Sequence, residues 1–359
     1  MNNILKNTFG FISQLNDAFT QLPPSFYEGL PAQNEADYVQ RFEEKLLFTP
    51  SPIIPVGGQL PSGDPINGLF SLVTLTSAQM LRMCEGGQRA QVLEKILATV
   101  NALSDCNIVG LGSLTGSSVT GSGLIIQGRA NTWLTSGNSF AALATVMSVE
   151  KIAQRLGLKL DQLTVGVLGA TGSIGQGVSM ELSKSVGKVV LAARQINLLE
   201  RLKKIMPGQT VITTEIDDLK EVDILVVTTA SSETLISVDW PKKGMIIVDE
   251  TKPRNTPSGL KNREDVIVLD GALISVPDID FNGMNMECPS GTIYACFAET
   301  MMLSLQGVNE HFNLGRVNPE VFPDMRILSQ RYGLDIAPFY SFGNLISEDR
   351  YDDFAKLLK

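Results

Sequence analysis

The chain has 359 residues, is 43% hydrophobic and 19% charged, and carries a formal net charge of −9. This length corresponds to about two domains, and the apolar content suffices for a buried core, which excludes a disordered chain. The acidic balance argues against a general nucleic-acid or anionic-membrane binder. The chain has one histidine, His311, so a metal site would need mostly other ligands, and we expect no metal. For the same reason we expect the reactive group of an enzyme of this sequence to be a residue other than histidine.

The four cysteines are widely spaced and form no CxxC pair, which indicates neither a zinc site nor a disulfide framework. No run of about 18 apolar residues is present, and the first residues lack a basic and apolar leader. We therefore expect a cytoplasmic protein with free thiols and no integral membrane segment.

The first part of the chain alternates loops with short regular elements. Residues 49–69 are rich in Pro and Gly and predict a loop with a short strand or hairpin. Apolar residues recur at helical spacing over residues 76–104. A buried strand from 107 then runs into a Gly/Ser/Thr-rich loop at 113–123. A second strand-to-loop junction at 132–138 precedes a helix over about 139–156, which ends at Gly157.

From residue 163 the pattern changes to apolar, β-branched runs separated by helical or loop segments. Such runs are typical of parallel strands buried on both faces. The predicted fold class is therefore α/β, a Rossmann-type doubly wound parallel sheet with an N-terminal α/β substrate domain and a helical C-terminal segment. The predicted strands are Thr164–Leu168, Lys188–Ala192, Ile224–Val227, 245–248 and 266–269, and the predicted divisions are 1–157, 158–285 and 286–359.

A glycine-rich turn between the first of these strands and a helix predicted at 177–185 indicates a dinucleotide site. Glycines spaced as GxxGxxG allow a tight turn and close approach of the backbone to a pyrophosphate, and the helix N-terminus offers N–H groups to the phosphates. The alternative is a glycine-rich turn in an unrelated α/β protein. The candidate cofactor-binding residues here are Gly169, Thr171, Gly172, Ser173, Ile174 and Gly175.

The next strand ends in Arg194, where an acidic residue would bind the ribose 2′-hydroxyl of NAD. An arginine instead accommodates a 2′-phosphate, so NADPH is the predicted cofactor. At the carboxyl end of a later strand, small residues leave room for the ribose and nicotinamide, and Thr228, Ala230 and Ser231 are candidates for cofactor contact.

Cys296 follows Pro289 and Ser290, which are predicted to open a helix with Ser290 as its N-cap. A thiol in the second turn of such a helix can have a lowered pKa and act as a nucleophile. Periodicity alone favours the other interpretation, a small residue in the core.

Several stretches, in the same order from about residue 68 to 335, resemble the long-chain acyl-[acyl-carrier-protein] reductases of cyanobacterial alkane synthesis. The family's Asp-Gly-Gly-Tyr-Pro-Lys-Asn appears here as Asp249-Glu-Thr-Lys-Pro-Arg-Asn, and its Thr-Gly-Asn-Thr-His as Ser136-Gly-Asn-Ser-Phe. The matching stretches include Leu111-Gly-Ser, Thr135-Ser-Gly-Asn, Gly169-Ala-Thr-Gly-Ser-Ile-Gly, Pro289-Ser, Ala295-Cys-Phe-Ala-Glu and Gly315-Arg.

The resemblance implies that Cys296 is the nucleophile. It would attack a fatty acyl thioester of an acyl carrier protein or of CoA, and NADPH would reduce the acyl-enzyme to a free aldehyde. The nicotinamide would then have to come close to Cys296, and Ser113 and Asn138 are candidate donors to the oxyanion. In the resembled system an aldehyde-consuming oxygenase receives the product, which makes such an enzyme a candidate partner.

Two other functions fit the same sequence. The order of a substrate domain followed by a Rossmann domain also fits an NADP-dependent dehydrogenase of a small hydroxy-acid or shikimate-like substrate, in which Cys296 would be a core residue. A non-enzymatic nucleotide sensor is the third hypothesis. Among other side chains, Lys252 could orient the nicotinamide or simply be solvated, and His311 is expected to be structural.

Overall fold

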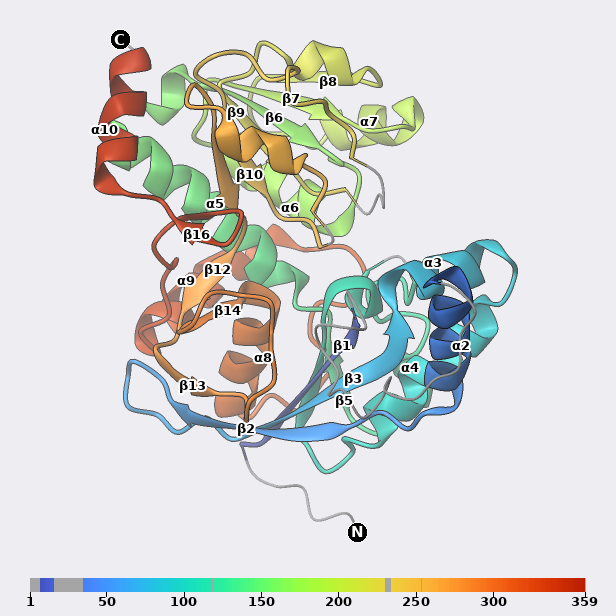
Figure 1. Cartoon of the computed structure of the whole chain (residues 1–359). Coiled ribbons are helices and arrows are strands. Elements are labelled where there is room, and N and C mark those ends of the chain that lie inside the picture. The colour runs from blue at the N-terminus through green and yellow to red at the C-terminus, as the bar shows by residue number, and fades with distance from the viewer. Residues whose placement is uncertain (1–6, 16–34, 118, 230–233, 253, 359) are drawn as a thin grey trace. The chain divides into compact units, whose positions relative to one another are not determined.

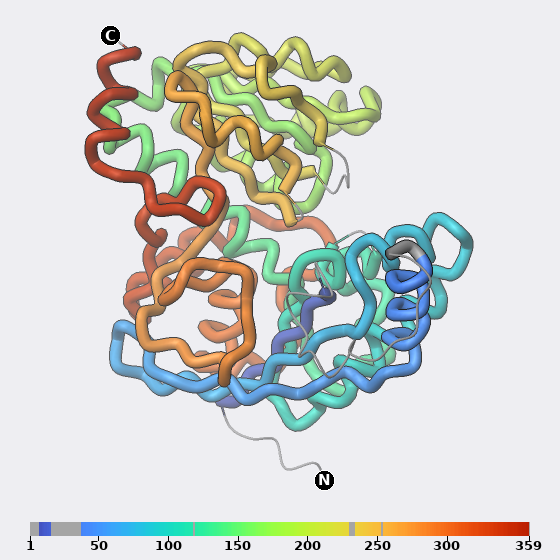
Figure 2. The backbone as a smooth tube through the Cα atoms, viewed as in Figure 1, coloured from blue at the N-terminus to red at the C-terminus, as the bar shows by residue number. Residues whose placement is uncertain are grey.

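A computed structural model describes residues 7–15, 35–117, 119–229, 234–252 and 254–358, and Figure 2 traces the backbone with the other residues in grey. The chain divides into two compact units. The N-terminal unit comprises residues 1–137, 277–287 and 296–315, and the Rossmann unit comprises 138–276, 288–295 and 316–359. Both units are discontinuous in sequence, whereas the predicted divisions are continuous, and the roles assigned to those divisions stay predictions.

The N-terminal unit is built on a six-stranded sheet in the order β13-β2-β3-β1-β4-β5. Strands β1, β3, β4 and β5 are parallel to one another. At one edge of the sheet, β2 pairs antiparallel with β3, and β13 pairs antiparallel with β2. The strands are β1 (Phe9–Leu15), β2 (Ile53–Gln59), β3 (Gly68–Thr76), β4 (Ile108–Leu111), β5 (Trp133–Thr135) and β13 (Asp278–Asp280), and the helices are α2 (Glu35–Phe48), α3 (Ser77–Glu85), α4 (Arg89–Asn101) and α8 (Ala295–Leu305).

Alternation along β1 divides the core of this unit between the two faces of the sheet. Ile12 packs in a buried cluster with apolar residues of α3 and α4. On the other face Phe9 and Phe11 contact Phe297 of α8, with ring centroids 5.3 and 4.6 Å apart. Helix α8 is thereby held against the sheet at the residue that follows Cys296.

The Rossmann unit contains six parallel strands in the order β11-β10-β9-β6-β7-β8. Numbered along the chain, this is the 3-2-1-4-5-6 order of a doubly wound dinucleotide-binding fold, which confirms the predicted fold class (Figure 1). The sheet strands are β6 (Thr164–Leu168), β7 (Lys188–Ala192), β8 (Thr210–Thr213), β9 (Ile224–Val227), β10 (Ile246–Asp249) and β11 (Ile267–Asp270).

Helices and small hairpins complete this unit. Fully buried Val, Ile and Leu side chains line β6, β9 and β10, as expected for strands covered on both faces. The helices are α5 (Asn138–Arg155), α6 (Ser173–Leu182), α7 (Ile196–Lys203), α9 (Phe322–Arg331) and α10 (Glu348–Leu357), and the small strands are β12 (Leu273–Ser275), β14 (Thr292–Tyr294), β15 (Tyr340–Ser341) and β16 (Asn344–Leu345).

Two predicted helix positions are wrong. Helix α6 begins at Ser173 rather than near Gly177, because Gly172 already adopts the extended N-cap conformation. Ser290 is not a helix N-cap: the β-branched and aromatic residues of β14 pair with β12 first, and α8 begins only at Ala295. Cys296 is therefore in the first turn of its helix and not in the second.

Candidate functional site

The glycine-rich turn after β6 has the geometry that a dinucleotide site requires. Gly169 has φ +92°, and a Cβ there would lie 3.0 Å from backbone atoms of Thr228 at the end of β9. A Cβ at Gly175 would lie 2.4 Å from the Gly169 carbonyl oxygen and 2.7 Å from Thr228 Oγ1. Only glycine fits these positions, so the turn lies tightly between the ends of the two central strands.

Helix α6 points its N-terminus at this turn. Its N-cap, Gly172, has no side chain and makes no side-chain capping bond. The first-turn N–H groups of a helix are suited to an anion such as a pyrophosphate. Thr171, Ser173 and Ile174 are partly buried around the turn. The residues present thus fit a nicotinamide dinucleotide, with the diphosphate at the N-terminus of α6.

The remaining cofactor candidates lie at the ends of neighbouring strands. Arg194 follows β7 and is exposed, and no described residue forms an ion pair with it. The Thr228 hydroxyl donates to the Leu168 carbonyl at 3.1 Å, which ties the end of β9 to the end of β6. Ala230 and Ser231 lie outside the described residues.

Cys296 is half-buried at the second position of α8. Burial raises the pKa of Cys106 to about 12 and also raises the pKa of Cys84, which disfavours their thiolates. Cys288 is also half-buried, and its sulfur donates to the Thr292 carbonyl at 3.2 Å. Of the four cysteines, Cys296 has the position at a helix start that a nucleophile favours.

A turn of the N-terminal unit packs directly against Cys296. Gly137 has φ +71°, and a Cβ there would lie 2.3 Å from the Cys296 Cβ and 2.7 Å from its Cα. Its N–H donates to Thr135 Oγ1 at 3.2 Å. The Thr135 hydroxyl in turn donates to the carboxyl group of Glu299, which is fully buried in α8. The first turn of α8 is thereby fixed against the loop after β5.

The two predicted oxyanion donors lie in different places. Ser113 belongs to the N-terminal unit, has φ +51°, and its Oγ accepts from Gln14 Nε2 at 2.8 Å. Asn138 begins α5 of the Rossmann unit and donates from Nδ2 to Ser173 Oγ at 3.3 Å. Asn138 is thus joined to the phosphate-binding turn.

Two further predicted side chains have mainly structural contacts. His311 Nδ1 accepts from the Leu134 N–H at 3.1 Å, and the imidazole lies edge-on to Trp133. Burial lowers the pKa of His311. The Lys252 ammonium lies 5.2 Å from the centre of the Tyr294 ring, a cation–π contact that holds it at the start of α8.

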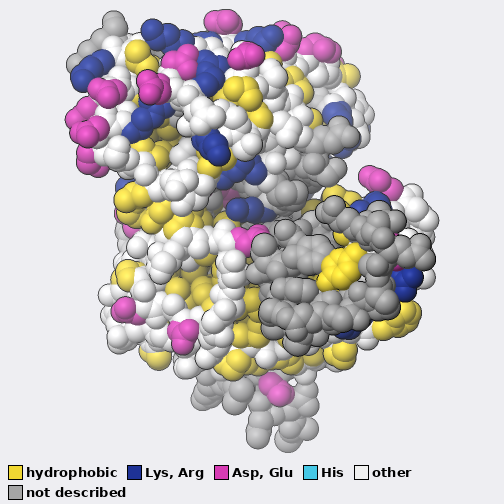
Figure 3. All heavy atoms as spheres, viewed as in Figure 1, with side chains coloured by type: hydrophobic (Ala, Val, Ile, Leu, Met, Phe, Trp, Pro, Cys, Tyr) yellow, Lys and Arg dark blue, Asp and Glu magenta, His cyan; other side chains and the backbone are white. Residues whose placement is uncertain are grey.

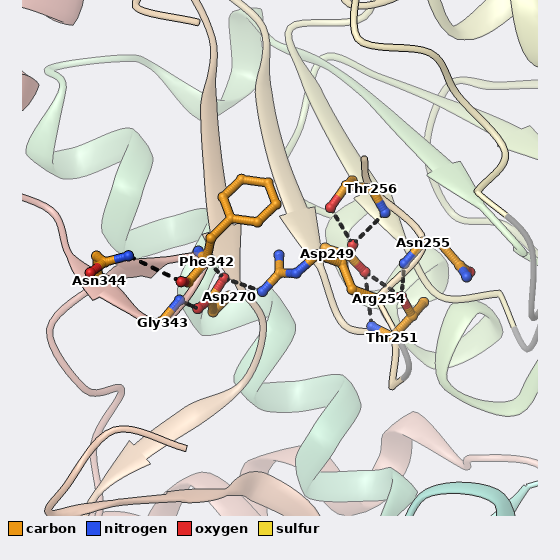
Figure 4. A network of polar contacts seen from close by, with 9 residues as sticks. All are labelled: Asp249, Thr251, Arg254, Asn255, Thr256, Asp270, Phe342, Gly343 and Asn344. Carbon is orange, nitrogen blue, oxygen red and sulfur yellow. Dashed lines mark hydrogen bonds and ion pairs between the residues drawn. The ribbon is translucent and has the colours of Figure 1, made fainter. Parts of the chain in front are cut away.

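A polar network that the sequence did not reveal follows β10 and β11 (Figure 4). Arg254 Nη2 donates to Asp270 Oδ1 at 2.5 Å, and its guanidinium stacks 4.5 Å over Phe342. Asp270 also accepts from the N–H groups of Phe342 and Gly343 at 2.9 and 2.7 Å. The loop after β10, the end of β11 and the β15–β16 hairpin are therefore fixed together.

Sequence reasoning also missed Thr135 and Glu299 as a pair. Both lie within stretches singled out for the resemblance, but the two residues are 164 positions apart. Only the pairing of α8 with the sheet brings them together. A buried carboxyl in an otherwise apolar helix segment is the one local signal that could have indicated a special role for Glu299.

The described part of the chain contains no group of three or more His, Cys, Asp or Glu side chains arranged to hold a metal ion. Over the same residues, none of the helices combines the length and apolarity needed to span a bilayer. In Figure 3, Lys and Arg side chains alternate with Asp and Glu over the visible face of the Rossmann unit, so this face carries no uniform charge.

Comparison with known proteins gives partial matches. Residues 150–278 match the family described as shikimate / quinate 5-dehydrogenase. A long-chain acyl-[acyl-carrier-protein] reductase of Synechococcus elongatus is 32% identical over 189 residues, which cover 51% of this chain and 55% of that protein. Aminotransferase PigE of a Serratia species is 24% identical over 304 residues, covering 80% of this chain and 34% of that protein.

The chain therefore spans about half the length of the first curated relative and about a third of the second. Among solved structures, the NAD-dependent malic enzyme of Thermotoga maritima aligns over 91% of this chain and 83% of its own, with 14% identity and a TM-score of 0.41. The strand order and the matched segment, residues 150–278, are those of a Rossmann unit with a site for a nicotinamide dinucleotide.

Proposed function

We propose that the chain reduces a fatty acyl thioester to a fatty aldehyde with NADPH, through an acyl-enzyme on Cys296. The observation that carries this proposal is the similarity to the Synechococcus acyl-[acyl-carrier-protein] reductase. The position of Cys296 at the start of a helix supports it, because such a position favours the thiolate. The donor would be an acyl carrier protein or CoA.

The first half of the reaction needs only protein groups. The Cys296 sulfur would attack the thioester carbonyl, form a new thioester, and release the carrier thiolate, which takes a proton from solvent or a nearby acid. Bound NADPH supplies hydride for the second half, which releases the aldehyde and regenerates the thiolate. The Gly137 turn would hold the thiol in place throughout, because it contacts the Cys296 backbone directly.

Donors to the oxyanion would come from Ser113 or Asn138. Asn138 contributes a side-chain amide, whose N–H groups are hydrogen-bond donors. Ser113 contributes a hydroxyl group, which is a hydrogen-bond donor as well as the acceptor that Gln14 uses. In this division of roles, residues 1–157 bind the substrate, 158–285 bind the cofactor and 286–359 carry Cys296.

Selection of NADPH over NADH would depend on Arg194. The residue lies two positions after β7, the second strand of this sheet in chain order, where the ribose 2′-position of a dinucleotide is recognised. Its guanidinium is exposed and has no ion-pair partner among the described residues, so it is available to a 2′-phosphate.

An acidic carrier protein would need a local basic surface, since the chain is acidic overall. Arg201, Lys203 and Lys204 are exposed on and after α7. Lys184 is exposed but pairs with Glu181 at 2.6 Å. Arg201, Lys203 and Lys204 have no ion-pair partner among the described residues and are therefore the better candidates for carrier contact.

Intact-mass analysis of the full chain tests the proposal. Incubation with acyl-carrier protein or acyl-CoA, without NADPH, should add one acyl group to the wild type and none to Cys296→Ala. Cys288→Ala is the matched control and should be acylated normally, since its sulfur is engaged with Thr292. An adduct that survives in Cys296→Ala, or no adduct with either donor, would contradict the proposal.

The match of residues 150–278 to the shikimate / quinate 5-dehydrogenase family favours a second candidate function. In this alternative the chain oxidises or reduces a small hydroxy-acid or shikimate-like substrate, and Cys296 is not acylated. Turnover of such a substrate by Cys296→Ala at the wild-type rate would support it.

A further inference from the structure

Glu250 lies at the carboxyl edge of the Rossmann sheet, in line with the residues that form the dinucleotide turn. It follows β10 directly, and its N–H donates to the Val227 carbonyl at the end of β9 at 3.0 Å. Thr228 follows Val227 and contacts the Gly169 turn. Gly169, Thr228 and Glu250 each follow the carboxyl end of a strand, β6, β9 and β10, and thus lie at successive positions along one edge of the sheet.

Two adjacent carboxyl groups at this edge have contrasting surroundings. Asp249 is buried and accepts four hydrogen bonds, from the N–H and hydroxyl groups of Thr251 and Thr256, at 2.5 to 3.0 Å (Figure 4). Four donors match the hydrogen-bond acceptor capacity of one carboxyl group. The Glu250 carboxyl group has one hydrogen-bond contact among the described residues, with Thr145 of α5 at 3.2 Å.

The Thr145 hydroxyl has two acceptors within hydrogen-bond distance, and Glu250 is the more distant one. The Thr145 oxygen lies 2.8 Å from the Ala141 carbonyl and 3.2 Å from Glu250 Oε2. A hydroxyl has one proton and a carbonyl can only accept, so the shorter contact uses that proton. The longer contact therefore gives an ionised Glu250 carboxylate only weak stabilisation.

The neighbouring elements confine this carboxyl group. A Cβ at Gly271, just after β11, would lie 2.5 Å from Glu250 Oε2 and 2.7 Å from the Asp249 carbonyl oxygen, so residue 271 has room for glycine only. Burial raises the pKa of Glu250 to about 8, against the hydrogen bond from Thr145, which lowers it. The negative charge of Asp249 adds to the upward shift, and the positive charge of Lys252 opposes it. From α5 the facing group is the uncharged Thr145, and Asp270 beyond Gly271 is paired with Arg254.

The order of the strands assigns Glu250 to one end of the cofactor. In a doubly wound fold the dinucleotide crosses the switch point, with one half of the sheet under each nucleotide. Arg194 and β7 belong to the adenosine half, so β9 and β10 belong to the nicotinamide half. The oxidised nicotinamide ring carries a positive charge, and the reduced ring carries none.

We propose that Glu250 is a positioning residue for the nicotinamide that is protonated beside the reduced ring and ionised beside the oxidised ring. This inference rests on the nicotinamide site of the proposed function but not on thioester chemistry. Binding of NADP⁺ to the protonated form then releases one proton to solvent, and binding of NADPH releases none. Raising the pH therefore strengthens NADP⁺ binding relative to NADPH binding, which would retain the oxidised product at high pH.

Titration calorimetry of the full chain with NADP⁺ and NADPH from pH 6.5 to 9.5 tests this. An opposite charge nearby shifts a carboxyl pKa by about one unit or more, so the ratio of the two dissociation constants should change about tenfold over this range. Buffers of different ionisation enthalpy should reveal proton release near pH 7.5 for NADP⁺ only. In Glu250→Gln the ratio should not vary with pH.

Two controls separate this effect from others. Glu264→Gln changes an exposed carboxyl before β11, at the opposite edge of the sheet, and should leave the pH dependence unchanged. The fragment 2′-phospho-ADP-ribose lacks nicotinamide, so Glu250→Gln should not alter the pH dependence of its binding. Because the fragment keeps the 2′-phosphate, its binding also shows how much of the pH dependence comes from titration of that phosphate.

A ratio that does not vary with pH in the wild type, or that varies equally in Glu250→Gln, would overturn the inference. Absence of binding by either nicotinamide cofactor would overturn it as well. Failure of the proposed function is a separate result, because it appears as no acyl adduct while the binding ratio still depends on pH. A melting curve of Glu250→Gln that matches the wild type shows that the variant is folded.

Discussion

Gly137→Ala is the substitution that most directly tests the packing around Cys296. The backbone of Gly137 is left-handed at φ +71°, and a Cβ would lie 2.3 Å from the Cys296 Cβ. The left-handed conformation costs an L-residue about 1–2 kcal/mol. Displacing the Cys296 backbone to relieve the overlap costs a further 1–3 kcal/mol or so. The expected loss in the free energy of unfolding is therefore about 2–5 kcal/mol.

Gly87→Ala provides a control within the same unit. Gly87 has φ +80°, and no atom lies within 4 Å of an added Cβ, so this substitution carries the conformational cost alone. Urea unfolding followed by circular dichroism should give Gly137→Ala the larger loss, by about 1–3 kcal/mol. The alkylation rate of Cys296 by iodoacetamide should change in Gly137→Ala and not in Gly87→Ala. Equal losses of stability and equal alkylation rates would refute the assigned packing.

Three other predictions concern the cofactor, the polar network and the single histidine. Replacing Arg194 by Ser should raise KM for NADPH about tenfold to a hundredfold and leave KM for NADH nearly unchanged, since a charged hydrogen bond contributes about 1.5–3 kcal/mol; steady-state kinetics with both cofactors will show whether it does. Asp270→Asn removes the charged partner of a mostly buried guanidinium and should destabilise the chain by about 2–4 kcal/mol. Asp353→Asn, in an exposed ion pair, should destabilise it much less; equal losses in urea unfolding would contradict this. Burial lowers the pKa of His311 in the folded chain. The neutral imidazole therefore contributes fully to the free energy of unfolding above the unfolded-state pKa of about 6.5, and this contribution is lost as the pH falls through the lower folded-state pKa. Between pH 7.5 and 5.5 the free energy of unfolding of His311→Asn should therefore fall less than that of the wild type.

The parallel sheet could be predicted from sequence because its strands are buried on both faces. The bounds of β6, β7 and β9 agree with the predicted runs residue for residue, and β10 and β11 begin one residue later than predicted. Strand β8 was missed because it has fewer apolar residues and is only partly buried. Strand β1 was missed because its pairing partners, β3 and β4, lie far along the chain.

The candidate site was predictable in part. The glycine turn has a spacing with a direct physical cause, so its residues could be named from sequence. The start of α8 could not be predicted from sequence, because the pairing of β14 with β12 overrides the helix-opening signal of Pro289 and Ser290. Glu250 could not be identified either, since its environment depends on Thr145 and Gly271, which are distant in sequence.

The most direct test of the central proposal is the discharge of an isolated acyl-enzyme. Wild-type protein acylated in the absence of cofactor is freed from excess donor and mixed with NADPH in a single turnover. The account predicts that one NADPH is oxidised and one aldehyde released per acyl group, while the protein mass returns to that of the unmodified chain. An acyl-enzyme that persists with NADPH, or that releases only the fatty acid, would contradict it.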